Sequence, residues 1–143
     1  MNRPAQRQYS EVQIKTANRG KLIVLLYQGA VRFMRKAQMQ LDDKDMEGKG
    51  NSLIRAQDII LELLYALDPQ MLESGNELAV NLQRLYLYSY RRLVHANINL
   101  DPEPINEVIL LLNNLLEAWE KVVASEAGRD MQAPAGPSML VAG

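Results

Sequence analysis

The chain has no cysteine and only one histidine, and these two shortages exclude several kinds of chemistry. Without cysteine there is no disulfide, no thiolate nucleophile, no iron–sulfur cluster and no cysteine-bound zinc. The single histidine, His95, is not part of a Glu-x-x-His pair, so the ligand set of di-metal helical bundles is missing. The sequence also lacks a glycine-rich phosphate loop and a Gly-x-Ser-x-Gly nucleophile elbow. We therefore expect neither an enzyme nor a bound metal or cofactor, and we place His95 on the solvated surface.

Long apolar segments are missing as well. The stretch from Leu22 to Val31 is the longest charge-free run in the body of the chain, and it has about half the length of a membrane-spanning helix. Residues 1–10 contain no apolar run of the kind found in signal peptides. Because the lack of cysteine also suits a reducing compartment, we expect a cytoplasmic protein that does not insert into a membrane.

Glycine and proline are few, and they leave long stretches free of helix breakers. The 143 residues include eight glycines and six prolines, and they are 48% hydrophobic and 23% charged, as in ordinary globular proteins. Apolar residues recur at helical spacing in four segments: 21–41, 53–67, 77–99 and 105–123. The pattern predicts an all-α fold, an antiparallel up-and-down four-helix bundle. We assign residues 18–127 to the bundle, residues 1–17 to an irregular N-terminal arm and residues 128–143 to a loose C-terminal tail.

Each segment has one apolar stripe that we expect to face the core. A loop over residues 70–76 is expected between the second and third helices, because Gly75 follows the Asp68-Pro69 stop. The residues that mark the expected core are Leu22, Leu26, Gly29, Ala30, Phe33, Ala37 and Leu41 in the first segment, Leu53, Ile60 and Leu67 in the second, Leu78, Leu82, Tyr86 and Leu93 in the third, and Trp119 in the fourth.

The first three segments carry more apolar residues than one core-facing stripe can use. In the third segment, the second stripe lies about 150° around the helix from the first. The additional residues are Val24, Tyr27 and Val31 in the first segment, Ile54, Leu61 and Tyr65 in the second, and Val80, Leu87, Val94 and Ile98 in the third. Either the core arc is wide and the rest are ordinary surface residues, or exposed grooves accept the apolar helix faces of a partner.

The net charge of −1 hides an uneven distribution. Residues 1–40 contain eight Lys or Arg and one acid, whereas residues 41–143 contain eight Lys or Arg and sixteen acids. A basic first helix packed among acidic neighbours explains this pattern. The other interpretation is nucleic-acid binding through Arg32, Arg35 and Lys36, which would depend steeply on salt. We favour the first interpretation and expect no nucleic-acid partner.

Two blocks of sequence resemble one known family. The run TANRGKLIVLLYQGAVRF, residues 16–33, is similar to the start of the flagellar secretion chaperone family FliS, where a Thr-Ala pair precedes L-I-x-x-L-Y-D-G-A. The run ELAVNLQRLYLYSYRRLVHAN, residues 77–97, is similar to that family's I-A-x-N-L-x-x-L-Y-D-Y-M-x-R-R-L-x-x-A-N. The segment RAQDIILEL from Arg55 and the Ala118-Trp119 pair follow in the family's order, so the resemblance covers about residues 9–125.

The resemblance implies a cytoplasmic helical bundle that binds the C-terminal segment of newly made flagellin. Such a protein prevents premature polymerisation and delivers flagellin to the flagellar type III export apparatus, where the export-gate protein FlhA is a further implied partner. The additional apolar stripes fit this role, and we expect a monomer or weak homodimer. The alternative from the residues alone is a homo-oligomeric structural bundle or adaptor without a flagellin client, which uses the same stripes to bind itself.

The resemblance also suggests polar and arm residues that touch the partner. In the family an N-terminal arm lies over part of the flagellin-binding surface, and Tyr9 stands at the second tyrosine of its Tyr-x-x-Tyr. Gln28 and Leu87 stand where the family has aspartate. The expected partner-binding residues, besides the additional apolar ones, are Tyr9, Val12 and Ile14 of the arm and Tyr88, Arg91 and Asn97 of the third helix.

Overall fold

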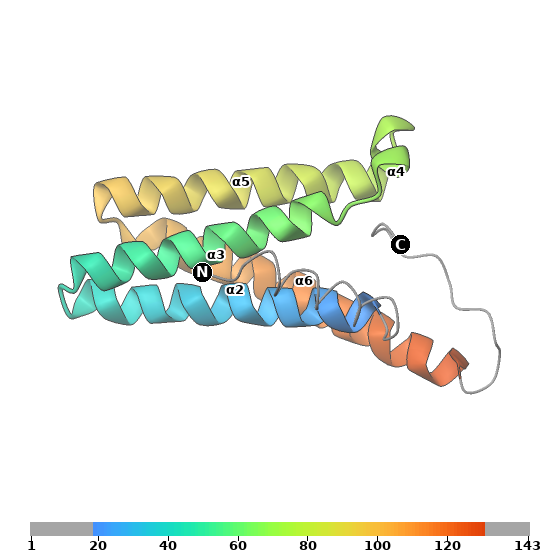
Figure 1. The fold of residues 1–143 in the computed structure, drawn as a ribbon, viewed down its shortest axis with the longest axis horizontal. Helices are drawn as coiled ribbons and strands as arrows, with labels where there is room; N and C mark the ends of the chain where they lie inside the picture. The colour runs from blue at the N-terminus through green and yellow to red at the C-terminus, as the bar shows by residue number, and fades with distance from the viewer. Residues whose placement is uncertain (1–18, 131–143) are drawn as a thin grey trace, which may run out of the picture.

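Four long helices and one short helix make up residues 19–130, the part of the chain that the structure, a computed structural model, describes (Figure 1). The long helices are α2 (Arg19–Asp42), α3 (Met46–Tyr65), α5 (Glu77–Asn99) and α6 (Pro102–Asp130), and the short one is α4 (Pro69–Glu73). No strand occurs within residues 19–130. The all-α prediction is confirmed.

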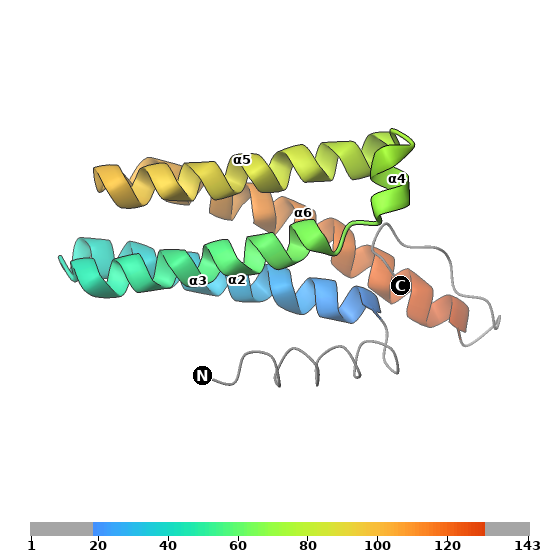
Figure 2. The same cartoon turned by 45° about the horizontal axis from the view of Figure 1, so that its top comes forward.

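The long helices pack in a ring, each against two neighbours. Both α3 and α6 contact α2, and both also contact α5, so the α2–α6 seam lies across the bundle from the α3–α5 seam (Figures 1 and 2). Lys49 near the start of α3 donates to Asn97 near the end of α5, as expected for an antiparallel pair. Successive long helices are neighbours in this ring, which confirms the predicted four-helix bundle.

Capping side chains set the start of two long helices. The Asp45 carboxylate accepts a hydrogen bond from the Gly48 N–H at 3.0 Å, so α3 begins well before Leu53. A Cβ at position 48 would collide with Asp45 and Gln40, so glycine permits this close turn. The Asn76 side chain caps α5, which spans residues 77–99 as predicted.

The connection between α3 and α5 is not the simple loop expected over residues 70–76. The Asp68 carboxylate accepts a hydrogen bond from the Gln70 N–H at 2.9 Å, and Pro69 occupies the first helical turn. Proline suits this position because its missing N–H has no helical partner there. The Asp-Pro pair therefore starts α4 as well as following α3, and α4 ends before Gly75, whose φ is +77°.

The core face of α2 differs from the predicted stripe. The buried apolar residues of this helix are Ile23, Tyr27, Ala30, Val31, Met34 and Ala37. The expected core residues that are only half-buried are Leu22, Leu26, Phe33 and Leu41. The interior face shares Ala30 and Ala37 with the predicted stripe but is turned from Leu22 and Leu26 toward Ile23 and Tyr27, because α2 packs against both α3 and α6.

Two other predictions of burial were wrong, and one prediction of exposure is confirmed. Leu78 is 56% exposed because it lies in the first turn of α5, at the end of the bundle. Trp119 is only half-buried, at the edge of the core, where it packs against the buried residues. The His95 side chain is 49% exposed, as expected for a surface residue.

Candidate partner-binding surfaces

Two residues expected on an outer apolar stripe of α2 belong to the core. Tyr27 and Val31 are 0% and 7% exposed, so the prediction of a free stripe there was wrong. Because the core-facing side of α2 is rotated from the expected side, the Tyr27 and Val31 side chains point inward. Val24 is half-buried beside the α2–α6 seam. Of the three, Tyr27 offers no surface to a docked partner.

Tyr27 instead pairs with Tyr86 across the core. Their hydroxyl oxygens lie 2.5 Å apart, and the Trp119 Nε1–H donates to the Tyr27 hydroxyl at 3.2 Å. Burial raises the pKa of Tyr27 to about 12, although its hydrogen bonds act in the opposite direction, and burial also raises the pKa of Tyr86. Both phenols are therefore neutral near pH 7, and their hydrogen bonds join α2, α5 and α6. The predicted core position of Tyr86 is confirmed, but no sequence signal pairs it with Tyr27.

The second expected stripe, on α3, is largely exposed. Ile54 and Tyr65 are 50% and 75% exposed, and Leu61 between them is half-buried. The other flank of α3 meets α2, because Ile59 lies 3.3 Å from where a Cβ would stand on Gly29. Ile54 and Leu61 lie about 140–160° around the helix from Ile59, which places them toward α5.

The third expected stripe, on α5, is exposed on the matching side. Ile98 and Leu87 are 74% and 37% exposed, and Val80 and Val94 are half-buried. Arg92 marks the other flank of α5, since its Nε donates to a carboxylate of α6 at 2.7 Å. Leu87 and Val94 lie about 140–160° around the helix from Arg92, which places them toward α3.

These two stripes therefore gather on one side of the molecule, along the seam between α3 and α5. Exposed apolar side chains concentrated on one side of a protein mark sites of interaction. The expected arm residues Tyr9, Val12 and Ile14 lie outside the described residues. We call the gathered set the α3–α5 apolar surface; it consists of Ile54, Leu61, Tyr65, Val80, Leu87, Val94 and Ile98.

The polar residue Tyr88 faces α6 rather than this surface. Its hydroxyl donates to Glu107 Oε2 at 2.5 Å, while Arg92 Nε donates to Glu107 Oε1 at 2.7 Å. The hydrogen bonds from Tyr88 and then Arg92 hold the pKa of the Glu107 carboxyl below its usual range. These hydrogen bonds join α5 to α6, and the Tyr88 hydroxyl uses its proton within the chain.

Asn97 is also engaged within the chain. Its Oδ1 and backbone oxygen accept hydrogen bonds from Lys49 Nζ at 2.5 and 3.2 Å. Lys49 is only 4% exposed, and its cation lies near the C-terminal end of α5, where the helix dipole favours positive charge. Sequence analysis missed this contact, because nothing in the glycine-flanked Lys49 indicates burial. Arg91 is exposed and forms no ion pair within residues 19–130, so its role in partner binding stays a prediction.

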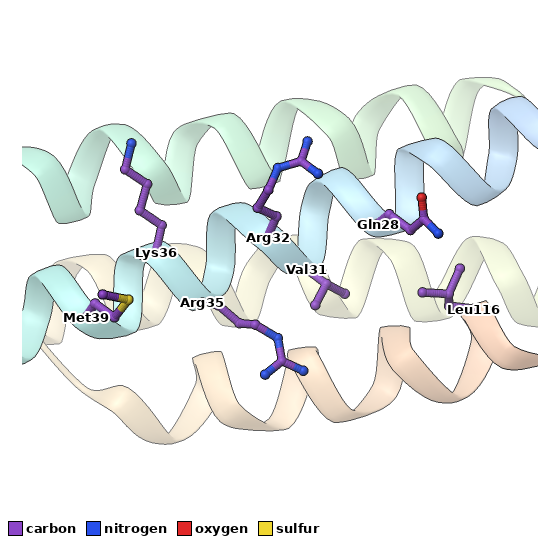
Figure 3. Close-up of a pocket in the computed structure, with 7 residues that line it drawn as sticks. All are labelled: Gln28, Val31, Arg32, Arg35, Lys36, Met39 and Leu116. Carbon is purple, nitrogen blue, oxygen red and sulfur yellow. The ribbon is translucent and has the colours of Figure 1, made fainter.

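A shallow groove runs along the opposite seam. Two adjoining hollows of about 450 and 440 Å³ share Gln28. In the first hollow, Arg35 extends from α2 toward α6, whereas Arg32 and Lys36 extend along the other side of α2 (Figure 3). We call both hollows together the α2–α6 groove; it is lined by Gln28, Val31, Arg32, Arg35, Lys36, Met39 and Leu116, and further along by Lys21, Val24, Leu25, Glu120, Val123 and Ala124.

The acidic neighbours expected around the basic first helix do not pair with these cations. Within residues 19–130, none of Arg32, Arg35 and Lys36 forms an ion pair with Asp or Glu. Sequence analysis singled out these cations but missed the groove, because the groove exists only through the pairing of α2 with the distant helix α6.

Comparison with known proteins identifies the family. Residues 1–126 match the family described as "Flagellar protein FliS". The chain belongs to the FliS family. A flagellar secretion chaperone FliS of Bacillus subtilis is 36% identical over 118 residues, which cover 82% of this chain and 85% of the relative. The FliS of Salmonella typhimurium is 38% identical over 112 residues, 78% of this chain and 82% of the relative, and that of Campylobacter jejuni is 35% identical over 125 residues, 87% and 95%.

Solved structures agree with the fold. A crystal structure described as a flagellar chaperone from bacteria matches with a TM-score of 0.70 at 19% identity, covering 88% of this chain and all of that one. The FliS family is a chaperone family, which confirms both the resemblance of the two sequence blocks and the expectation of a non-enzymatic protein. Among the described residues, no helix has the length and apolar character needed to span a membrane.

Proposed function

We propose that this chain is a cytoplasmic export chaperone that binds the C-terminal segment of flagellin, prevents its premature polymerisation and delivers it to the flagellar type III export apparatus. The names of the relatives, flagellar secretion chaperones, support this proposal. The observation that carries it is the α3–α5 apolar surface, on which Ile54, Tyr65 and Ile98 are at least half exposed in the folded chain.

Exposed apolar area is what a client of this kind requires. A disordered segment loses conformational entropy when it becomes ordered on a chaperone, and burial of apolar surface has to offset that loss. A large apolar side chain that passes from full exposure to full burial contributes about 1.5–3 kcal/mol. Several such side chains along one seam can hold an amphipathic client segment, and covering its apolar face prevents polymerisation by occupancy. The mechanism needs no covalent or nucleotide-dependent step.

The test is direct binding of a flagellin C-terminal peptide to the full chain. We expect size exclusion with light scattering to show a one-to-one complex, and calorimetry to show saturable binding. The chain should also delay polymerisation of intact flagellin when present in equimolar amount. If the chain instead self-associates with rising concentration and the peptide neither binds nor changes this, the homo-oligomeric bundle is the better interpretation.

Delivery requires a second contact, for which the export-gate protein FlhA is the proposed receiver. The resemblance to the family supports this step. We expect the cytoplasmic part of FlhA to bind the chain with its flagellin peptide more tightly than either component alone. We further expect the free chain to be a monomer or a weak homodimer, and light scattering over a concentration series measures this.

A further inference from the structure

The α2–α6 groove lies across the bundle from the surface proposed for flagellin. The ring of helices places the α2–α6 seam and the α3–α5 seam on opposite sides (Figures 1 and 2). A ligand in the groove would therefore leave the α3–α5 apolar surface free. The groove is a separate feature that flagellin binding at the other seam does not explain.

The groove has an apolar floor and apolar margins. Val31 and Leu116 line the hollow of about 450 Å³ between the two helices (Figure 3). Met39 is 66% exposed at one end of the groove, and Leu25 is 62% exposed in the adjoining hollow. Flexible, exposed side chains of this size favour contact with another apolar surface.

Positive charge is concentrated at the end of the groove near Met39. Arg32, Arg35 and Lys36 are exposed there, and none of them pairs with an acid in the part of the chain that the structure describes. Their spacing places like charges side by side on one helix, which is slightly unfavourable in the free protein. Carboxylates of a ligand would relieve this repulsion and accept charge-assisted hydrogen bonds.

We infer that the α2–α6 groove is a second docking site, which binds an acidic amphipathic helix of another protein. The lining of the groove extends along α2 from Lys21 to Met39, ~27 Å at 1.5 Å per residue, so a helix of about 18 residues fills it. The apolar face of that helix lies on Val31 and Leu116, and its carboxylates face Arg35, which extends toward α6 (Figure 3). Arg32 and Lys36, on the other side of α2 at the edge of the hollow, add attraction at longer range. The helix runs antiparallel to α2, because acids are most favourable in the first turns of a helix and the cations lie toward the C-terminal end of α2.

The same cations would attract nucleic-acid phosphates, but the rest of the groove fits a protein helix better. None of the described side chains that line the groove is aromatic, so unpaired bases have no ring to stack on. Glu120 at the far end repels phosphate, and Leu25 and Met39 gain nothing from a sugar–phosphate backbone.

The test uses the full chain and a synthetic helical peptide of about 18 residues, with leucine at every third or fourth position and glutamates in its first two turns. Calorimetry is expected to show one-to-one binding that persists when the flagellin peptide is present at saturation. Arg32→Glu combined with Arg35→Glu should weaken binding about tenfold or more, because attractive contacts become repulsive. Replacing the glutamates of the peptide by glutamine should weaken binding to the parent chain in the same direction, and Met39→Asp should weaken it through the apolar contact.

The matched control is Arg84→Glu combined with Lys121→Glu, which changes the net charge equally at exposed positions outside the groove lining. We expect this control to bind the acidic peptide as the parent does. The inference is overturned if the acidic peptide does not bind, if both double variants weaken it equally, or if the flagellin peptide displaces it.

Other occupants of the groove give distinct results, each of which also overturns the inference. A DNA oligonucleotide that binds more tightly than the acidic peptide, with a steep salt dependence, would indicate nucleic acid. Self-association that is lost with Arg32→Glu and Arg35→Glu would indicate a second copy of the chain. Amide resonances of residues 1–18 or 131–143 that shift in the free double variant would indicate that the groove holds a segment of this chain. Acidic-peptide binding and flagellin-peptide binding are measured separately, so failure of one does not decide the other.

Discussion

The two opposite seams of this bundle combine apolar surface with charge in different ways. On the α3–α5 seam the most exposed apolar side chains are Tyr65 and Ile98, at 75% and 74%. On the α2–α6 seam Met39 is exposed to a similar extent, 66%, but three cations without acid partners in residues 19–130 accompany it. A closed ring of four helices can thus present two chemically different surfaces, because residues at the outer seams can vary without altering the core.

The two seams share one core, and truncation of a large side chain in that core should lower the free energy of unfolding more than any surface substitution. Tyr27 is fully buried on α2 and is hydrogen-bonded to Tyr86 of α5 and Trp119 of α6. We expect Tyr27→Ala to lower the free energy of unfolding by about 3–5 kcal/mol, as for other large aromatic residues replaced in a core. Urea denaturation followed by circular dichroism measures this change, and both peptides should lose binding in proportion to the fraction unfolded.

Tyr27→Phe separates the polar contribution from the packing contribution. This variant keeps the ring but leaves the Tyr86 hydroxyl and the Trp119 N–H without their shared partner, at an expected cost of about 1–3 kcal/mol. An unchanged free energy of unfolding would show that the hydroxyl cluster does not stabilise the bundle.

The next largest effect concerns the α3–α5 seam alone. Ile54→Asp combined with Ile98→Asp places unpaired charges on exposed positions of the proposed flagellin surface. We expect the affinity for the flagellin peptide to fall by about thirtyfold or more, which corresponds to about 2 kcal/mol. The melting temperature should stay near that of the parent, since both side chains are at least half exposed.

Leu110→Asp is the control for this variant. Leu110 is 64% exposed on α6, outside both surfaces, so its replacement should not change the affinity for the flagellin peptide. A folded Ile54→Asp and Ile98→Asp variant with parental affinity would show that flagellin binds elsewhere on the chain.

Helix periodicity predicts the fold well but leaves the orientation of α2 open. In α5 the core residues Leu82, Tyr86 and Leu93 form one stripe, and all three are buried as predicted. In α2 the consecutive residues Leu22 to Leu26 are all apolar, so spacing alone cannot choose which face is interior. Packing against two neighbouring helices decides this, and it buries Ile23 and Tyr27 instead of Leu22 and Leu26.

For the surfaces too, features set by a pattern within one helix could be predicted from the sequence, whereas features set by packing between helices could not. The outer stripes of α3 and α5 can be predicted from the sequence. When the residues are arranged around the helix axis, polar residues lie between Ile54 or Leu87 and the core stripe of the same helix. The α2–α6 groove depends on Leu116 lying beside Val31, a contact between residues far apart in the chain that no local pattern contains. The burial of Lys49 is hidden for the same reason, since its partner Asn97 lies on another helix.

A smaller effect tests whether the cations of the α2–α6 groove act independently of the α3–α5 apolar surface and of the core. Arg32→Glu combined with Arg35→Glu should leave the affinity for the flagellin peptide within about twofold, and it should raise the free energy of unfolding by about 0.3–0.5 kcal/mol. The reason is that the repulsion between Arg32 and Lys36 is replaced by attraction between a carboxylate at position 32 and Lys36 one turn away, whereas positions 32 and 35 carry like charges before and after the change. Thermal melts at low and high salt measure the change, which salt should diminish. A clear loss of stability would mean that these cations have acidic partners in the folded chain.

The smallest expected effect concerns the α5–α6 seam, which lies between the two surfaces, and it is a change in pH dependence. Tyr88 and Arg92 donate to Glu107 and hold the pKa of its carboxyl below the usual value of 4.5. A carboxyl whose pKa is lower in the folded chain stabilises the fold above its unfolded pKa, and this contribution is lost as the pH falls through the folded pKa.

Glu107→Gln should therefore melt slightly below the parent from about pH 7 down to about pH 4.5, and the difference should shrink at lower pH as the parent carboxyl becomes protonated. The effect is small because the groups are exposed and solvent screens their charges. Glu117→Gln, at an exposed position on the same helix, is the matched control for the loss of one surface carboxylate. If both variants follow the same course between about pH 7 and about pH 3, the Glu107 cluster does not stabilise the contact between α5 and α6 in solution.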